Sequence, residues 1–329
     1  KDLYKQGTRD YMPVIPQDEN YMNIKLVVND ILDDSKRVRF SNNKEMNFIP
    51  TNKFILPVDS AKVIKNRVVA PENANLIVKN IEWEIPDNIL QKNMIAMMDI
   101  LANFNWDRPI YFAVTTGNDA YFGLEKYFQL EGLAYRLVPI RNDAPSEDLS
   151  LGRINTNVLY NNLMNKFTWG GLNNPSVYLS EDNIRLTMTI RTIFGRLANS
   201  LISENKIDSA LKVLDRAEEI MPNKLVPYNY FNLPLAEAYY RIGTPAAVAK
   251  GQAMLETLIK ICDSELTYYF RFKGSMKAGV DREIQQNLGI LQRLSQIAET
   301  YKADVVKKQA DSIFEMSYTQ WAQNKGNTR

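Results

Sequence analysis

One pattern in the second half of the chain limits its possible folds more than any other feature of the sequence. Over the 34 residues from Arg191 to Lys224, large and small apolar residues recur at spacings that place them on the facing sides of two antiparallel helices. Small residues let the two backbones approach closely, and larger ones fill the space between successive helix pairs. The positions concerned are Phe194, Leu197, Ala198, Leu201, Ala210, Leu214 and Ala217, and Pro222 ends the second helix.

The same spacing is the signature of the tetratricopeptide repeat, and two looser helix pairs follow it. The first contains "LAEAY" at 235–239 and a helix over 247–261, and the second pairs residues 282–301 with 304–322. We predict that the apolar faces of the last pair contain Ile284, Leu288, Leu291, Leu294 and Ile297, then Val305, Ile313 and Phe314. One regular repeat and two irregular pairs predict a short solenoid, a fold whose stacked surface commonly serves binding.

The first half of the chain mixes short strands with helices. Apolar runs predict strands over 52–59, 75–85, 108–115 and 133–140. Helical spacing predicts helices over 21–35 and 121–132. A third helix is predicted from an N-cap at Asp87 to residue 104. The predicted fold class is an α+β or α/β N-terminal domain over residues 1–140, followed by an all-α domain of tetratricopeptide-like helical hairpins over 184–322. Residues 141–183 form a linker and a connecting helix, and residues 323–329 are expected to fray.

The composition narrows the chemistry through what is missing. The chain has no histidine, so the commonest general base at neutral pH and the commonest zinc ligand are both absent, and we predict no metal and no cofactor. Acidic stretches at 29–34 and 142–150 lack the spacing of a calcium loop. The single cysteine, Cys262, lies on an apolar helix face and is predicted to be a buried structural thiol.

Charge and hydropathy bear on the partners. The net charge is only +2 and no long basic stripe is present, which argues against nucleic acid as a partner. No apolar run approaches the roughly 18 residues of a membrane helix. The chain starts with Lys1 instead of methionine, and its first residues read as the middle of a sequence pattern. We interpret it as part of a longer protein.

The loop at Gly117 and Asn118 is the first candidate binding site. It follows the strand predicted at 108–115 and opens the helix predicted at 121–132, a position where strand ends and a helix N-terminus can hold an anionic ligand. A lone glycine is weak evidence, because the chain has no GxGxxG or Walker pattern. A capped structural turn explains the same residues.

Aromatic and basic residues near this loop are the second candidate. Trp106 and Arg108 could stack on a sugar and pair with a phosphate, and the cluster also contains Tyr111, Tyr127 and Tyr135. The structural alternative is a hydrophobic core in which Asp107 and Arg108 form a pair that fixes a helix-to-strand turn.

Two loops between predicted helices are the third candidate. Residues 166–178 and 227–234 are rich in asparagine, tyrosine and tryptophan. Such loops either line a groove or fill the seam of a solenoid. The candidates for ligand or partner binding in these loops are Trp169, Asn229 and Tyr230.

Several long motifs together resemble a known family. They are "DILANFNWDRPIYFAVT", "YFGLEKYFQLEGLAYRLVPI", "YNNLMNKFTWGGLNNPSVYL" and "PYNYFNLPLAEAYY". They look like the soluble C-terminal region of a Bacteroidota membrane-protein family, formerly of unknown function, that is grouped with protein O-mannosyltransferase-like enzymes as glycosyltransferase family 117. The resemblance runs from "YKQGTRDYMPV" almost to the end of the chain.

The resemblance implies a membrane-bound glycosyltransferase that transfers a sugar from a polyprenyl phosphate to protein hydroxyls. Its catalytic acids belong to a membrane part that no residue here matches, so we assign no catalytic residue. The implied location is a periplasmic domain held at the inner membrane by an N-terminal part that precedes this chain. We therefore expect a non-catalytic domain that binds or presents the acceptor protein or a complex partner. A sugar or lipid-phosphate module at the Gly117 loop, and a purely structural role in dimerisation, are the alternatives.

Overall fold

The computed structural model describes residues 11–39, 45–143, 151–273 and 275–326. It confirms the predicted fold class, because small mixed sheets occupy the N-terminal part and helices occupy the C-terminal part. Contacts within the chain divide it into two compact units, Lys1–Asn155 and Thr156–Arg329. None of the helices in the described ranges combines the length and the hydropathy that crossing a membrane requires.

Four small sheets lie in the described part of the first unit. In the central one, β5 (Lys53–Pro57) pairs with β2 (Met22–Asn23) in parallel and with β6 (Asn80–Glu84) in antiparallel orientation. A second sheet has the order β11 (Arg153–Ile154), β9 (Phe128–Leu130), β10 (Ala134–Leu137), β8 (Tyr111–Ala113). The two remaining sheets are two-stranded and pair β1 (Tyr11–Pro13) with β7 (Ile89–Gln91) and β3 (Val38–Arg39) with β4 (Glu45–Met46).

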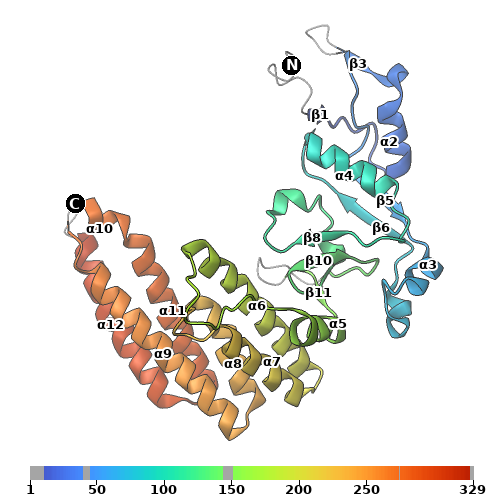
Figure 1. The fold of residues 1–329 in the computed structure, drawn as a ribbon. Helices are drawn as coiled ribbons and strands as arrows, with labels where there is room; N and C mark the ends of the chain where they lie inside the picture. Colours follow the sequence, from blue (N-terminus) through green and yellow to red (C-terminus); the bar gives the residue numbers. More distant parts are fainter. Residues whose placement is uncertain (1–10, 40–44, 144–150, 274, 327–329) are drawn as a thin grey trace. The chain divides into compact units, whose positions relative to one another are not determined.

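The core of the first unit forms on the antiparallel pair of β5 and β6. Alternate residues of these strands are buried, as a half-covered antiparallel pair requires, and they include Phe54, Leu56, Ile81 and Trp83. The Phe54 and Trp83 rings stack with their centroids 5.4 Å apart. Helices α2 (Ile24–Leu32) and α4 (Lys92–Ala102) pack on each other, α2 also contacts β5, and α3 (Ser60–Lys65) follows β5 in the chain (Figure 1).

Two helix predictions in this unit are wrong. Residues 121–132 form no α-helix: a 3-10 turn at Glu125–Tyr127 leads directly into β9, which pairs with β10. Gly123 prevents a continuous helix, because its φ is +75° and a Cβ there would lie 2.5 Å from the carbonyl oxygen of Glu84. Asp87 is not an N-cap either, since β7 comes first and Gln91 is the N-cap residue of α4.

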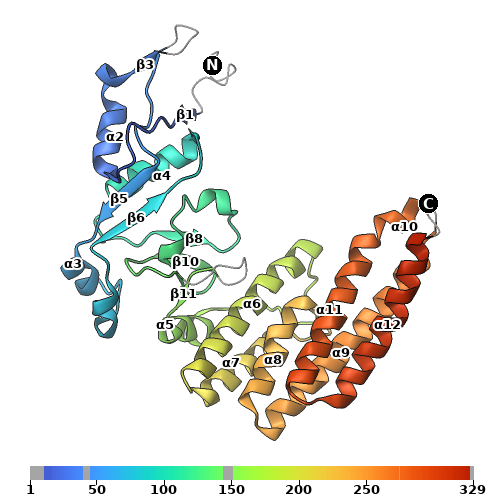
Figure 2. The same cartoon turned by 180° about the vertical axis from the view of Figure 1, so that it is seen from behind.

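The second unit is built from antiparallel helix pairs. They are α6 (Glu181–Ser203) with α7 (Ile207–Ile220), α8 (Leu233–Ile242) with α9 (Pro245–Tyr269), and α11 (Asp281–Thr300) with α12 (Asp304–Gly326). Figures 1 and 2 show these pairs side by side in sequence order, and α6 contacts α8 while α9 contacts α11. The short helices α5 (Thr156–Asn161) and α10 (Ser275–Gly279) complete the unit, and α12 extends four residues into the segment predicted to fray.

Burial confirms the tetratricopeptide pattern. Its helical positions from Phe194 to Ala217 are at most 2% exposed, as the close packing of two paired helices requires. The next pair comes equally close at Gly251, where a Cβ would lie 3.1 Å from the carbonyl oxygen of Ala236. On the last pair, the prediction for Val305 is wrong, because that side chain is 64% exposed and Val306 is buried instead.

Cys262 is buried on α9, as predicted. Burial, with the nearby Glu265 carboxylate as a smaller cause, raises the pKa of its thiol to about 12. The thiol is therefore protonated and unreactive at neutral pH, which fits a structural role.

Candidate functional site

A cleft of about 700 Å³ lies beside the Gly117 loop in the first unit. This volume is typical of ligand sites. Asn118, from the predicted candidate pair, lies in its wall, and Gly117 adjoins it as the N-cap residue of a short 3-10 turn, Asn118–Ala120. The strand before the loop, β8, pairs in antiparallel orientation with β10, whereas ligand positions beyond strand ends are typical of open parallel sheets.

Carboxylates and apolar side chains share the wall of this cleft, which we call the β6 cleft. Its lining comprises Glu84, Ile85, Pro86, Asp87, Met94, Asn118, Asp119, Phe122, Gly123, Glu125, Lys126 and Leu151. Four carboxylates face one ammonium group, a net charge of −3, and none of these five groups forms an ion pair with a described residue. Burial raises the pKa of Glu125 above its usual range.

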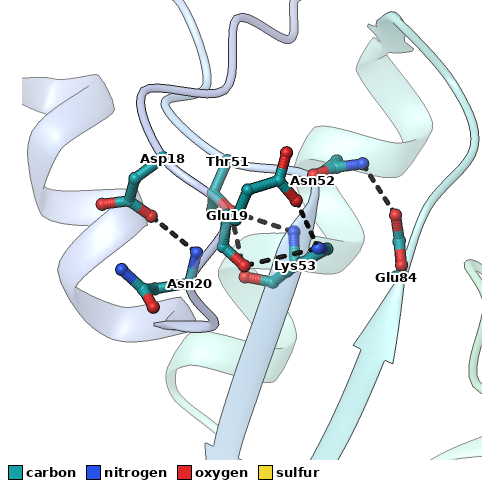
Figure 3. Close-up of polar contacts among 7 residues, drawn as sticks. All are labelled: Asp18, Glu19, Asn20, Thr51, Asn52, Lys53 and Glu84. Atoms are coloured by element: carbon teal, nitrogen blue, oxygen red, sulfur yellow. Dashed lines mark hydrogen bonds and ion pairs between the residues drawn. The ribbon is translucent and has the colours of Figure 1, made fainter.

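Glu84 is held in place by Asn52, which directly precedes β5, the strand paired with β6. The side-chain amide of Asn52 donates a hydrogen bond of 3.0 Å to its carboxylate (Figure 3). Asn52 lies beside Lys53, whose ammonium group reaches the Glu19 carboxylate at 2.8 Å, and the Thr51 hydroxyl accepts from the Lys53 backbone at 3.0 Å. This polar cluster fixes the start of β5 and thereby one wall of the β6 cleft.

Trp106 and Arg108 lie apart from this cleft and do not form the predicted stacking site. Trp106 is 3% exposed, has a φ of +66° and packs on Phe104 with ring centroids 4.6 Å apart. The expected Asp107–Arg108 pair is replaced by an ion pair between Asp107 and Lys62 at 2.8 Å, which lowers the pKa of Asp107. Arg108 is exposed and has no ion pair within the described parts of the chain.

Trp169 packs against the helical unit. Its ring lies 5.4 Å from that of Phe194, the aromatic position of the repeat, and 5.9 Å from that of Phe167. The loop turns back through Gly170 and Gly171, both with positive φ. Trp169 therefore packs on the first helix of the repeat, whereas residues 173–178 of the same loop are exposed.

Asn229 and Tyr230 lie in the connection between the first two helix pairs. The Asn229 side chain accepts from the backbone N–H of Phe231 at 3.0 Å, and the Asn232 side chain accepts from the backbone N–H of Asn229 at 3.1 Å. This capping box gives Asn229 a structural role. The Tyr230 ring is 48% exposed, which leaves it open to a partner.

A second cleft, of about 580 Å³, lies between α7 and α9 over α8. The Tyr239 hydroxyl donates to the Asp215 carboxylate at 3.0 Å, and the Lys250 ammonium group lies 2.6 Å from the same carboxylate. Burial raises the pKa of Tyr239, so this phenol stays protonated and acts as a donor. The positive charge of Lys250 thus compensates the Asp215 carboxylate. The carboxylates that line the β6 cleft have no such ion pair with a described residue.

Arg191 lies behind this second cleft and was not among the predicted residues. It is fully buried, and its guanidinium group donates to the carbonyl oxygens of Pro227 at 2.7 Å, Met221 at 3.1 Å and Val226. Its charge also stacks over the Tyr228 ring at 5.5 Å. The available signal was its position three residues before Phe194, on an otherwise apolar helix face.

The comparisons with known proteins bear on the first unit. Residues 1–158 match the family model described as TMEM260-associated domain 2. No curated protein and no solved structure matches the chain. The first unit is therefore similar to a domain associated with TMEM260, a protein O-mannosyltransferase-like protein.

Proposed function

We propose that this chain is the non-catalytic periplasmic part of a membrane-bound protein O-mannosyltransferase-like enzyme, and that it binds the acceptor protein or a complex partner. The observation that carries the proposal is the match of residues 1–158 to a TMEM260-associated domain. Membership of glycosyltransferase family 117, the Bacteroidota source and the inner-membrane location are what the resemblance of the motifs quoted above implies, and they belong to the proposal.

The helical unit supports a binding role. Its helix pairs stack in sequence order, and this arrangement gives solenoids an extended surface for protein partners. The exposed Tyr230 ring lies in the connection between two pairs, where an aromatic side chain can anchor a partner.

The alternative, a lipid-phosphate site at the Gly117 loop, has weaker support. Its adjacent cleft has four carboxylates and one lysine, and this charge repels a phosphate. The short 3-10 turn at Asn118–Ala120 also lacks the aligned backbone of a long helix that would offset this repulsion.

The test uses the longer protein to which this chain belongs. Residues 1–329 are deleted in one variant, and glycosylation of the acceptor protein is measured in membranes that contain either form. We expect acceptor glycosylation to fall strongly while transfer to a short acceptor peptide persists, because only the protein acceptor needs presentation. Direct binding of the unmodified acceptor to the 329-residue chain is then measured by calorimetry. Unchanged glycosylation of the protein acceptor, together with no binding, would refute the proposal.

A further inference from the structure

β8 is an edge strand, the last in the order β11, β9, β10, β8, so a strand of its sheet lies on only one of its two sides. On that side, the Val114 N–H donates to the Leu133 carbonyl oxygen at 3.2 Å, and the Leu137 N–H donates to the Ile110 carbonyl oxygen at 3.0 Å. In an antiparallel pair such bonds involve every second residue of a strand. The residues between them point their N–H and C=O groups to the other side of the strand.

Tyr111 and Ala113 are the residues whose backbone groups point to the outer side of β8. The Ala113 carbonyl oxygen accepts from the Thr116 N–H at 3.1 Å, in the turn that follows the strand. The two N–H groups and the Tyr111 carbonyl oxygen have no hydrogen-bond partner among the residues that the structure describes. Both residues are exposed. The outer edge of β8 therefore offers two donors and one acceptor to another extended backbone.

The free edge of β6 in the central sheet, by contrast, is covered by the chain itself. The Tyr127 hydroxyl accepts from the Glu82 N–H at 3.1 Å and donates to the Glu82 carbonyl oxygen at 3.2 Å. Gly123 packs so close to the Glu84 carbonyl oxygen that a Cβ would lie 2.5 Å from it. Folded proteins usually block their edges, because an open edge is a template for pairing. Within the described ranges, the outer edge of β8 has no comparable cover.

The charge along this edge limits the kind of segment that fits it. Arg108 is the only charged residue between positions 108 and 116. It is exposed and forms no ion pair with a described residue. Beyond it, the segment would meet uncharged groups, which include the Tyr111 ring with 47% exposure. A carboxylate on the bound segment is attracted to Arg108, whereas a lysine at the same place is repelled.

We propose that the outer edge of β8 binds an extended segment of the acceptor protein by strand addition, with an acidic residue of that segment opposite Arg108. The assignment rests on the proposed function, since it specifies where the acceptor docks and in which conformation. Backbone pairing gives affinity for an extended chain of many sequences. Alternate side chains of such a segment stay on the two faces of the sheet, where their hydroxyl groups are accessible.

The experiment titrates the whole 329-residue chain with a fluorescent nine-residue peptide of alternating threonine and valine that has blocked termini and one glutamate at an end. One control peptide has N-methyl groups on its backbone nitrogens, and another has lysine in place of glutamate. We expect saturable binding of the glutamate peptide and at least tenfold weaker binding of the N-methylated one. The lysine peptide should bind about threefold more weakly than the glutamate peptide, and Arg108→Ala should remove this difference.

Two substitutions of one residue separate backbone pairing from side-chain contact. Ala113→Pro removes the outward N–H, and an edge strand tolerates proline there, so binding of the glutamate peptide should weaken at least tenfold. Ala113→Thr keeps the N–H and should change binding less than twofold. Far-UV circular dichroism checks that both variants fold.

Amide hydrogen exchange of the unmodified chain tests the edge without any substitution. The Ala113 amide should exchange rapidly in the free chain and at least tenfold more slowly when the glutamate peptide is saturating. The Val114 amide, which already bonds to Leu133, should change less than twofold.

Three results would overturn the assignment: no binding of the glutamate peptide at 1 mM (roughly the weakest affinity of interest), equal binding by Ala113→Pro and Ala113→Thr, or an Ala113 amide that is already protected in the free monomer. Dimerisation of the chain that Ala113→Pro abolishes would assign the edge to a second copy and overturn it as well. Failure here leaves acceptor capture by another surface of the chain intact, whereas failure of the deletion experiment leaves peptide binding at β8 intact. The two proposals are therefore tested separately.

Discussion

Replacing Arg191 with methionine should destabilise the helical unit more than any surface change. The guanidinium group is fully buried and donates to three carbonyl oxygens of the loop that connects α7 to α8. Methionine fills much of the same volume but donates no hydrogen bond, so buried carbonyl groups lose their partner at about 1–3 kcal/mol each. Glu218, whose carboxylate is attracted to Arg191, loses its compensating charge as well.

Partial entry of water will offset some of these losses. We therefore expect the free energy of unfolding to fall by about 3–5 kcal/mol in total, the range measured when one member of a buried charged network is removed. For a unit of this size, that loss corresponds to a fall in melting temperature of roughly 6–20 °C. Urea denaturation followed by far-UV circular dichroism measures the change in the free energy of unfolding.

Two controls define this experiment. Arg185→Met, on the same helix, removes a 69% exposed side chain with a surface ion pair to Asp182 and should cost at most about 1 kcal/mol. Arg191→Lys keeps the charge but cannot reach all three carbonyls, and it should fall between the wild type and Arg191→Met. A loss below about 1 kcal/mol for Arg191→Met would show that the arginine does not hold the loop, contrary to our reasoning.

Four further predictions follow from single positions. Gly123→Ala should cost about 2–4 kcal/mol by urea denaturation, since it adds a backbone clash to positive-φ strain, whereas Gly170→Ala, with no atom within 4 Å of the new Cβ, should cost only about 1–2 kcal/mol. Leu214→Ala in the repeat core should cost about 2–5 kcal/mol in the same assay, and a cost below 1 kcal/mol would contradict the packing described for the first helix pair. Because burial raises the pKa of Glu125, its ionisation opposes folding, so Glu125→Gln should be more stable than the wild type at pH 7 and lose that advantage as the pH falls from the raised folded-state pKa to the unfolded-state value near 4.5. Cys262 should react with a thiol reagent at pH 8 only after denaturant is added, and rapid labelling of the native protein would show that the thiol is accessible.

Periodicity predicted the helical unit well because its burial depends on residues close together in the sequence. The positions from Phe194 to Ala217 lie within two neighbouring helices, so the pattern alone identifies the packed face. The role of Arg191 was not predictable in this way, because its hydrogen-bond acceptors lie at least 30 residues further along the chain, in a loop.

The first unit shows why local patterns fail. Apolar residues around Phe122 and Tyr127 have helical spacing, but the positive φ of Gly123 and the pairing of β9 with β10 determine the structure. The β6 cleft was only partly predictable for a similar reason. The sequence singled out Asn118, whereas Glu84 and Asp119 lie 35 residues apart and meet only through the fold.

The proposed function requires that the chain holds a protein partner and leaves the transfer of the sugar to the rest of the enzyme. The most direct measurement incubates the purified chain with the unmodified acceptor protein and a polyprenyl-phosphate sugar, then quantifies both complex formation and glycosylated product by mass spectrometry. We expect a complex and no product above the level formed without the chain. Sugar transfer catalysed by residues 1–329 alone would contradict it.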